Sequence, residues 1–149
     1  MAAELKQALF EHLSANATIA AIVGARIVPN VAPTTATTGT TSASFFPYLA
    51  YERLSSDHVR HAGGPSGLAQ GRMQIECWGL DSVTVESLAD AVRRALQNFI
   101  GNMGAIALPV YSTLVDSMGD TVKFPETAAD PIKWNVSVNV SIWYRESTT

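Results

Sequence analysis

Two histidines and an aspartate lie close together in the sequence and could, in principle, bind a metal ion. Asp57 and His58 are adjacent, and His61 follows shortly after them. These side chains would converge only on a helix, whereas the Gly-Gly-Pro run at 63–65 predicts a loop. A zinc site normally takes three or four well-placed ligands. We therefore expect a solvated polar loop here, with no metal site.

The single cysteine, Cys77, could act as a nucleophile if a loop histidine served as its base. In the segment Gly71–Trp78, however, Met73, Ile75 and Cys77 alternate with polar residues. This pattern predicts a strand that carries the thiol on its apolar face, where a buried cysteine is inert. One cysteine also excludes an intramolecular disulfide and a multi-cysteine zinc site. We expect Cys77 to be a core residue.

The segment Gly-Gly-Pro-Ser-Gly at 63–67 has the glycines of a phosphate-binding loop. It lacks the Lys-Ser/Thr that should follow, and it leads into a predicted strand instead of a helix. It also matches a bare Gly-x-x-Gly, but it carries none of the basic residues of RNA-binding loops of that kind. A tight turn is the better interpretation. A small hydrolase or metal enzyme would have to depend on His58, His61 or Cys77, and we expect neither an enzyme nor a cofactor.

Length and composition indicate one soluble domain over residues 1–149, with a core large enough to be stable without disulfide bonds or metal ions. Hydrophobic residues make up 47% of the chain and charged residues only 15%, and a thinly charged surface favours protein partners. With 10 Lys and Arg against 13 Asp and Glu, the net charge of −3 gives no attraction for phosphate backbones. No signal peptide or membrane-spanning run is visible, so we expect no membrane contact and assembly in the cytoplasm.

Two amphipathic segments predict the main helices. Residues 2–15 form the first, and the second begins after Asp81, which can cap it. A short turn between Asn16 or Thr18 and Gly24 is expected after the first helix. The apolar positions are Leu5, Ala8, Leu9 and Leu13 in the first helix and Val85, Leu88, Ala89, Val92, Leu96 and Phe99 in the second.

Alternating or aromatic-rich sequences predict about four substantial strands. In the last of them, even-numbered residues from Ile132 to Ile142 should face the core, whereas Lys133, Asn135, Ser141 and Trp143 should lie on the polar face. The result is an α+β domain, with an antiparallel or mixed sheet of about four strands and two main helices packed on one face. The strands are expected at Pro47–Ser55, Gly71–Trp78, Ile106–Ser117 and Ile132–Tyr144, with a brief one at Arg26–Val28, and loops at 30–44, 57–70 and 117–130.

Between Pro47 and Leu96, short motifs follow one another in an order that resembles the tail-completion, or tail-terminator, proteins of long-tailed phages and prophages. They are PYLAYERLS, His61 with GGPSGLAQGRMQIECWG, and SLADAVRRAL, and the N-terminal IVGARIVP fits as well. The resemblance covers roughly the first two-thirds of the chain, counting elements by their period. The Thr-rich loop at 30–44 is longer than the family leads us to expect, and no motif after Gly101 matches it.

The resemblance implies a structural subunit of the virion tail or neck. Such a subunit would form a ring, commonly a hexamer, that caps the tail tube, docks onto the head connector or stopper protein and lets DNA pass without specific binding. A mildly acidic chain agrees with a neutral or negative lumen, an expectation that a lumen lined by Arg53, Arg72 and Arg94 would overturn. The alternative from another class is a soluble adaptor that binds a partner through its loops without forming a ring.

Several residues are candidates for contacts with neighbouring subunits or partners. Trp143 has two interpretations: a strand-end tryptophan tucked beneath a loop, or an interface anchor, since exposed tryptophans are favoured at subunit contacts. The other candidates lie in the expected loops or are exposed cations: Thr37, Thr38, Thr40, His58, His61, Pro65, Ser66, Arg53 and Arg72.

Overall fold

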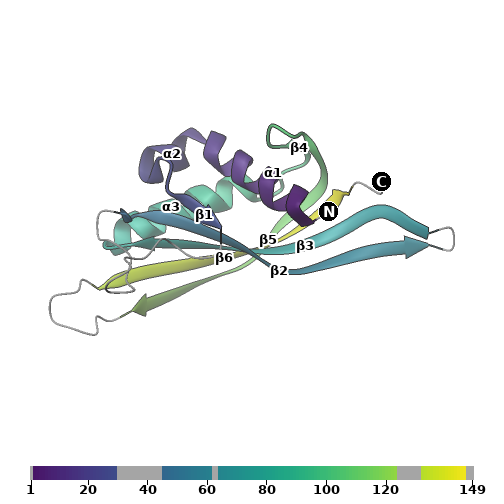
Figure 1. The fold of residues 1–149 in the computed structure, drawn as a ribbon. Helices are drawn as coiled ribbons and strands as arrows, with labels where there is room; N and C mark the ends of the chain where they lie inside the picture. Colours follow the sequence, from purple (N-terminus) through teal and green to yellow (C-terminus); the bar gives the residue numbers. More distant parts are fainter. Residues whose placement is uncertain (1, 30–44, 62–63, 124–131, 147–149) are drawn as a thin grey trace, which may run out of the picture.

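A computed structural model of the protein describes residues 2–29, 45–61, 64–123 and 132–146. It contains a single six-stranded sheet with three helices on one face, as Figure 1 shows. The helices are α1 (Ala2–Ala15), α2 (Ala17–Val23) and α3 (Ser82–Leu96). The strands are β1 (Ile27–Pro29), β2 (Tyr48–His61), β3 (Gly64–Gly79), β4 (Gly101–Met103), β5 (Leu108–Lys123) and β6 (Lys133–Arg145). The α+β class is therefore confirmed.

The sheet is mixed, with strand order β1-β2-β3-β6-β5-β4. Only the short β1 runs parallel to its neighbour; the other four pairings are antiparallel. The expected number of about four strands is too low, because β4 is an additional strand only three residues long and too short to show a period.

Two expected loops are largely strand. The predicted loop at 57–70 is a β-hairpin, because β2 continues to His61 and β3 already starts at Gly64. The predicted loop at 117–130 starts late, since β5 continues to Lys123. The third expected loop, at 30–44, lies outside the described residues. The two long hairpins, β2–β3 and β5–β6, turn at opposite ends of the sheet (Figure 1).

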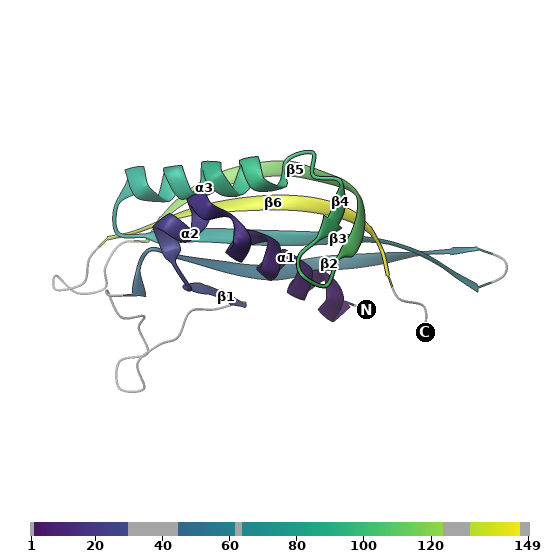
Figure 2. The same ribbon diagram turned by 90° about the horizontal axis from the view of Figure 1, so that it is seen from above.

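The helices begin and end where local chemistry allows. The side chain of Asn16 accepts a hydrogen bond from the Ile19 amide at 3.1 Å, which makes it the cap of α2, and Gly24 ends this helix with a φ of 59°. Asp81 caps α3 as predicted, and its carboxylate accepts from the Val83 amide. Seen from above, in Figure 2, the three helices lie over the sheet from its middle to near the end where β5 and β6 turn, and they leave the outer part of the β2–β3 hairpin uncovered.

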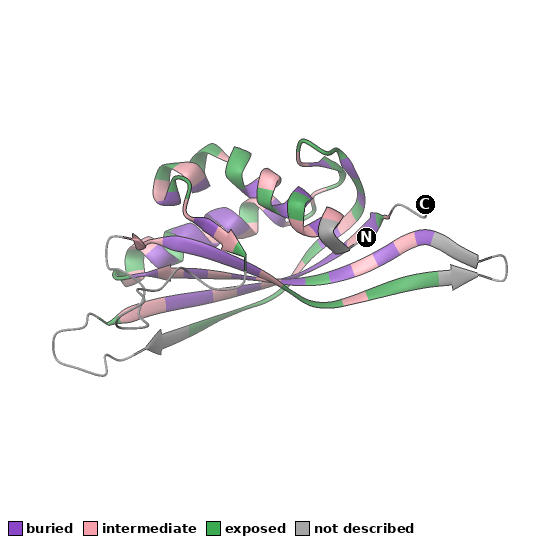
Figure 3. Ribbon diagram, viewed as in Figure 1, coloured by how far each residue is buried: buried purple, intermediate pink, exposed green. Residues whose placement is uncertain are grey.

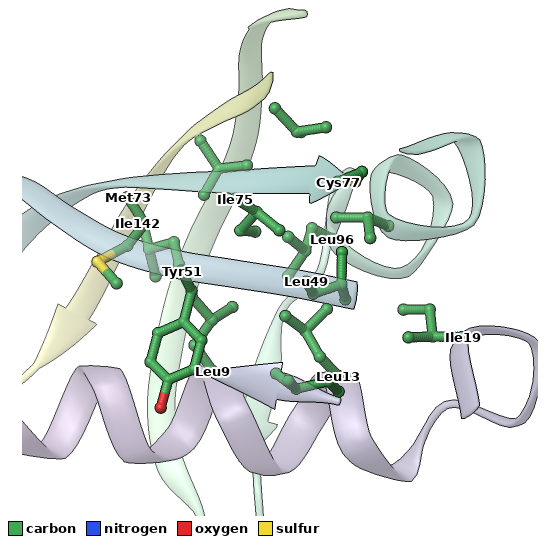
Figure 4. Packing of buried hydrophobic residues seen from close by; sticks show 14 of the residues in the cluster. Leu9, Leu13, Ile19, Leu49, Tyr51, Met73, Ile75, Cys77, Leu96 and Ile142 are labelled. Atoms are coloured by element: carbon green, nitrogen blue, oxygen red, sulfur yellow. The ribbon is translucent and has the colours of Figure 1, made fainter. Parts of the chain in front are cut away.

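One continuous core fills the space between the helices and the sheet. The helix positions predicted for the core are buried, except that Phe99 lies beyond the end of α3 and is half-buried. Met73, Ile75 and Cys77 of β3 are fully buried as expected, and Figure 4 shows them facing Leu9, Leu13 and Leu96 of the helices. In β6 the alternation holds from Val136 to Ile142, but Ile132 precedes the strand and is 41% exposed, so its core assignment is wrong.

Candidate assembly interface

The β2–β3 hairpin extends past the rest of the sheet as an arm, which we define as residues 53–61 and 64–72. Strand β6 accompanies β3 only as far as Leu68, so the outer part of the arm consists of two strands alone. Figure 3 shows the β2 side of the arm as almost entirely exposed. Two-stranded ribbons in water are marginally stable on their own, so the root of the arm must be held by the body of the domain.

The last residues of the described chain hold this root. The Glu146 amide donates a hydrogen bond to the Gly67 carbonyl at 2.7 Å. The Glu146 carboxylate lies 2.8 Å from Nδ1 of His58, in an ion pair if the imidazole is protonated. His58 therefore lies in a strand at the arm root and not in a loop. Its Nδ1 atom is occupied by the contact with Glu146.

The two candidate arginines of the arm lie on opposite faces of the sheet. Arg53 is paired with Met73 on the helix side, and Arg72 is paired with Ser141 on the other side. Both are exposed, and neither forms an ion pair with another described residue. Arg94, by contrast, lies on α3 with its Nε 3.0 Å from Asp90. The three arginines considered for a lumen therefore do not share one surface.

The other candidates are placed only partly. Pro65 and Ser66 lie within β3 by their backbone, so the Gly-Pro-Ser-Gly segment belongs largely to a strand, not to the tight turn expected. His61 ends β2. Thr37, Thr38 and Thr40 lie outside the described residues.

The sheet face opposite the helices is open and mainly polar. Trp143 lies on it, between Gln70 of β3 and Ser112 of β5, and is half-buried. Its predicted place on the polar face agrees with this register, while its role as an anchor stays a prediction. Hydrogen bonds between β6 and β5 tie this face together: Ser141 Oγ donates to Asp116, and Asn139 Nδ2 donates to Ser117 Oγ at 3.0 Å.

An aromatic cluster that the sequence interpretation did not single out covers the end of this open face farthest from the arm. Tyr48 stacks near-parallel on Trp78, with ring centroids 6.4 Å apart, and the rings of Phe45 and Phe46 lie within 5.2 Å of Tyr48. The amino group of Lys133 lies 5.8 Å from the centroid of the Phe46 ring. The run Phe-Phe-Pro-Tyr was the signal that could have identified this cluster, because a strand start so rich in aromatic residues must cover part of a sheet.

The groups that could carry chemistry have structural roles. Burial, together with the charge of Glu76, raises the pKa of the Cys77 thiol far above its ordinary value, which disfavours the reactive thiolate. In the hollow beside α1, Nε2 of His12 lies 2.9 Å from the Ala95 carbonyl and the Glu11 carboxylate accepts from the Ile106 amide. Among the residues that the structure describes, no group of three His, Cys, Asp or Glu side chains could hold a metal ion.

Within the same described ranges, no helix has both the length and the apolar character needed to cross a membrane. The features that remain are an exposed two-stranded arm, a polar open sheet face and an aromatic cluster at one end of it. Surfaces of this kind serve contacts between proteins better than they serve chemistry on a small molecule.

Comparisons with known proteins place these features in a context. A family model described as "Tail completion protein gp17" matches residues 7–99, which is more than half of the chain. Among solved structures, the fold is similar to that of a chain described as "Virion of native gene transfer agent (GTA) particle", with a TM-score of 0.67 and 16% sequence identity. The similarity covers 95% of this chain and 94% of that chain. No curated protein matches the chain.

Proposed function

The chain belongs to the tail completion protein gp17 family, and we propose that it forms a hexameric ring that ends the tail tube and joins it to the head connector. Family membership makes it a structural protein of the virion tail. The ring, the number of its subunits and the DNA channel through it go beyond the family assignment. The observation that carries the proposal is the match over residues 7–99, which includes most of α1, the arm and all of α3.

The similar chain of the gene transfer agent supports the same conclusion at the level of fold. Because the similarity covers nearly the whole of both chains, the complete domain has a counterpart in an assembled virion. At 16% identity this likeness concerns the fold alone. What it adds is that a domain of this shape can be built into a phage-like particle.

The architecture suits a subunit whose work is geometric. Three central pairings, β2–β3, β3–β6 and β6–β5, extend over most of the length of these strands. Packed sheets and helices deform little, because protein interiors have low compressibility. A rigid subunit keeps a fixed angle between neighbours. Head-to-tail contacts at a fixed angle form a closed ring when the rotations between successive subunits add up to a full turn.

The charges are compatible with passage of DNA. The net charge is −3, and Arg53, Arg72 and Arg94 lie on the helix side of the arm, on the open face of the arm and on α3, respectively. Strong binding of DNA backbones requires several cations on one surface. A channel built from these subunits should therefore let DNA slide without holding it.

Native mass spectrometry and negative-stain electron microscopy test the proposal on the purified full-length protein, alone and mixed with tail tubes. We expect a mass of six subunits, or a ring-shaped cap at one end of the tubes. A protein that stays monomeric at high concentration and leaves the tube ends bare would contradict the ring. That result would favour the soluble adaptor instead.

A further inference from the structure

Strands β2 and β5 are each paired on their outer side over only part of their length. Strand β1 covers β2 at Leu49–Tyr51, and β4 covers β5 at Leu108–Val110. Among the described residues, no strand pairs with the outer side of β2 from 52 to 58 or of β5 from 112 to 123. We call these two stretches the β2 free edge and the β5 free edge. Unpaired edge strands present rows of amide and carbonyl groups to any strand that can reach them.

Neither free edge is protected by proline, and both expose apolar side chains. Leu54 of the β2 free edge is 54% exposed, and Leu114 and Met118 of the β5 free edge are 49% and 41% exposed. Each edge region does contain register shifts, at 53/55 and 58/60 on β2 and at 115/117 on β5. Such irregularities bend a strand and limit regular pairing to short segments. The register shifts restrict which strand can pair with each edge, so they favour one specific partner over non-specific aggregation.

The direction of the strands fits a second copy of this chain. Because β2, β3, β6 and β5 are joined by three successive antiparallel pairings, β5 runs opposite to β2. A neighbour that continues the sheet without being turned over would therefore place its β2 antiparallel to this β5. Head-to-tail contact of this kind is the heterologous type that a ring requires.

The position of the free edges along the strands also fits. Strand β1 covers β2 at the end where the β5–β6 hairpin turns, and β4 covers β5 at the end where the arm begins. The two free edges consequently lie at opposite ends of the sheet (Figure 1). The arm of one copy can lie along the β5 free edge of the next copy without meeting β1 or β4.

The charges disfavour a contact between two β5 free edges. The described side chains of the β5 free edge include two acids, Asp116 and Asp120, and no basic residue. The described side chains of the β2 free edge are mixed, with the acids Glu52 and Asp57 and the exposed cation Arg53. Two β5 free edges side by side would bring only acids together, whereas the β2 free edge also offers them an arginine. Charges of opposite sign across an interface fix partner and register more than they add affinity.

We propose that neighbouring subunits of the ring are joined by strand pairing between the β2 free edge of one copy and the β5 free edge of the next. This inference rests on the proposed ring and specifies how its neighbours meet. It identifies the exposed arm as the element that reaches across the subunit boundary.

Cysteine crosslinking tests this pairing, because the native Cys77 is fully buried. Leu54→Cys and Leu114→Cys would each be prepared alone, assembled on tail tubes, and treated with a short bis-maleimide. We expect a covalent dimer when the two variants are mixed, and none when either is used alone. A protein that carries both substitutions should give a ladder of bands that ends at the number of subunits in the ring. Val83→Cys on α3, which is 69% exposed and away from both edges, is the matched control and should not crosslink to Leu54→Cys.

The outcomes separate this inference from the ring itself. Rings seen by microscopy without crosslinks in the mixture, or with dimers of a single variant, would overturn the β2–β5 pairing and leave the ring standing. Bare tubes and monomers alone would overturn the ring, and the pairing with it.

Discussion

The contact between Leu5 of α1 and Gly71 of β3 offers a quantitative test of how the root of the arm is held. Leu5 is fully buried, and a Cβ added at Gly71 would lie 2.2 Å from its Cδ2. Truncation of a buried leucine to alanine costs about 2–5 kcal/mol of unfolding free energy. Leu5→Ala should fall in that range.

Gly71→Ala should cost about 1–3 kcal/mol, because the new methyl group overpacks this site. The slightly better strand propensity of alanine offsets part of that cost, by about 0.5–1 kcal/mol. In the double variant the methyl group occupies space that Leu5 has left. The total loss should therefore be smaller than the sum of the single losses by about 1–3 kcal/mol, as is usual for residues in contact.

Urea unfolding of the four proteins, at a concentration where they are monomeric, measures these differences as shifts of the midpoint at constant slope. Gly119→Ala on β5 is the matched control, because a Cβ there meets nothing within 4 Å, so stability should not fall and could rise by about 0.5–1 kcal/mol. Additive losses, or a Gly71→Ala variant as stable as Gly119→Ala, would refute the packing of α1 onto the arm root.

Two further predictions concern single side chains. Burial holds the pKa of Cys77 above its ordinary value of 9.0, so above pH 9 the unfolded state releases a proton that the folded state keeps. The free energy of unfolding should therefore fall as the pH rises above 9, by about 1.4 kcal/mol at about pH 10. Urea unfolding at several pH values should show this loss in the wild type, and a Cys77→Ala variant that loses just as much would contradict it. Trp143→Glu should change unfolding free energy by only about 1 kcal/mol, since the side chain is half-buried at the open face, but should abolish assembly on tail tubes. A folded variant that still forms the wild-type oligomer would exclude the anchor.

The elements that contact the core on one side were predictable from the sequence. Each of these elements, α1, α3 and the inner part of β3, buries one face. Their apolar residues therefore recur at the helical period of about 3.6 residues or the strand period of two. The open face of β6 was predictable for the same reason, because Ser137, Asn139 and Ser141 alternate with buried valines and isoleucine.

Strand β2 of the arm was missed because it has no buried face that could impose alternation. The buried positions of β3 in the arm are the small residues Gly67, Ala69 and Gly71, which give only a weak hydrophobic pattern. From Ser55 to Val59 every residue except Ser56 is exposed, and the glycines and proline at 63–67 predict a turn where β3 already starts at Gly64. The β5 extension from Met118 to Asp120 is likewise exposed, beyond the reach of the helices. Polar segments of this kind are held as strands by pairing with a distant strand, and periodicity within one segment cannot reveal that pairing.

If neighbours pair through β2 and β5, the placement of all three helices on one side gives the assembly two different faces. Strand pairing between copies would extend the sheet into a belt with the helices on one side and the open polar face on the other. On that face lie the acids Glu52, Glu76 and Asp116 and the cations Arg72 and Lys133, so these charges give no net attraction for phosphate. The helix side exposes apolar residues such as Val83. The polar face is thus the better wall for a water-filled channel that conducts DNA, and the helix side is the better surface for contact with other proteins of the particle.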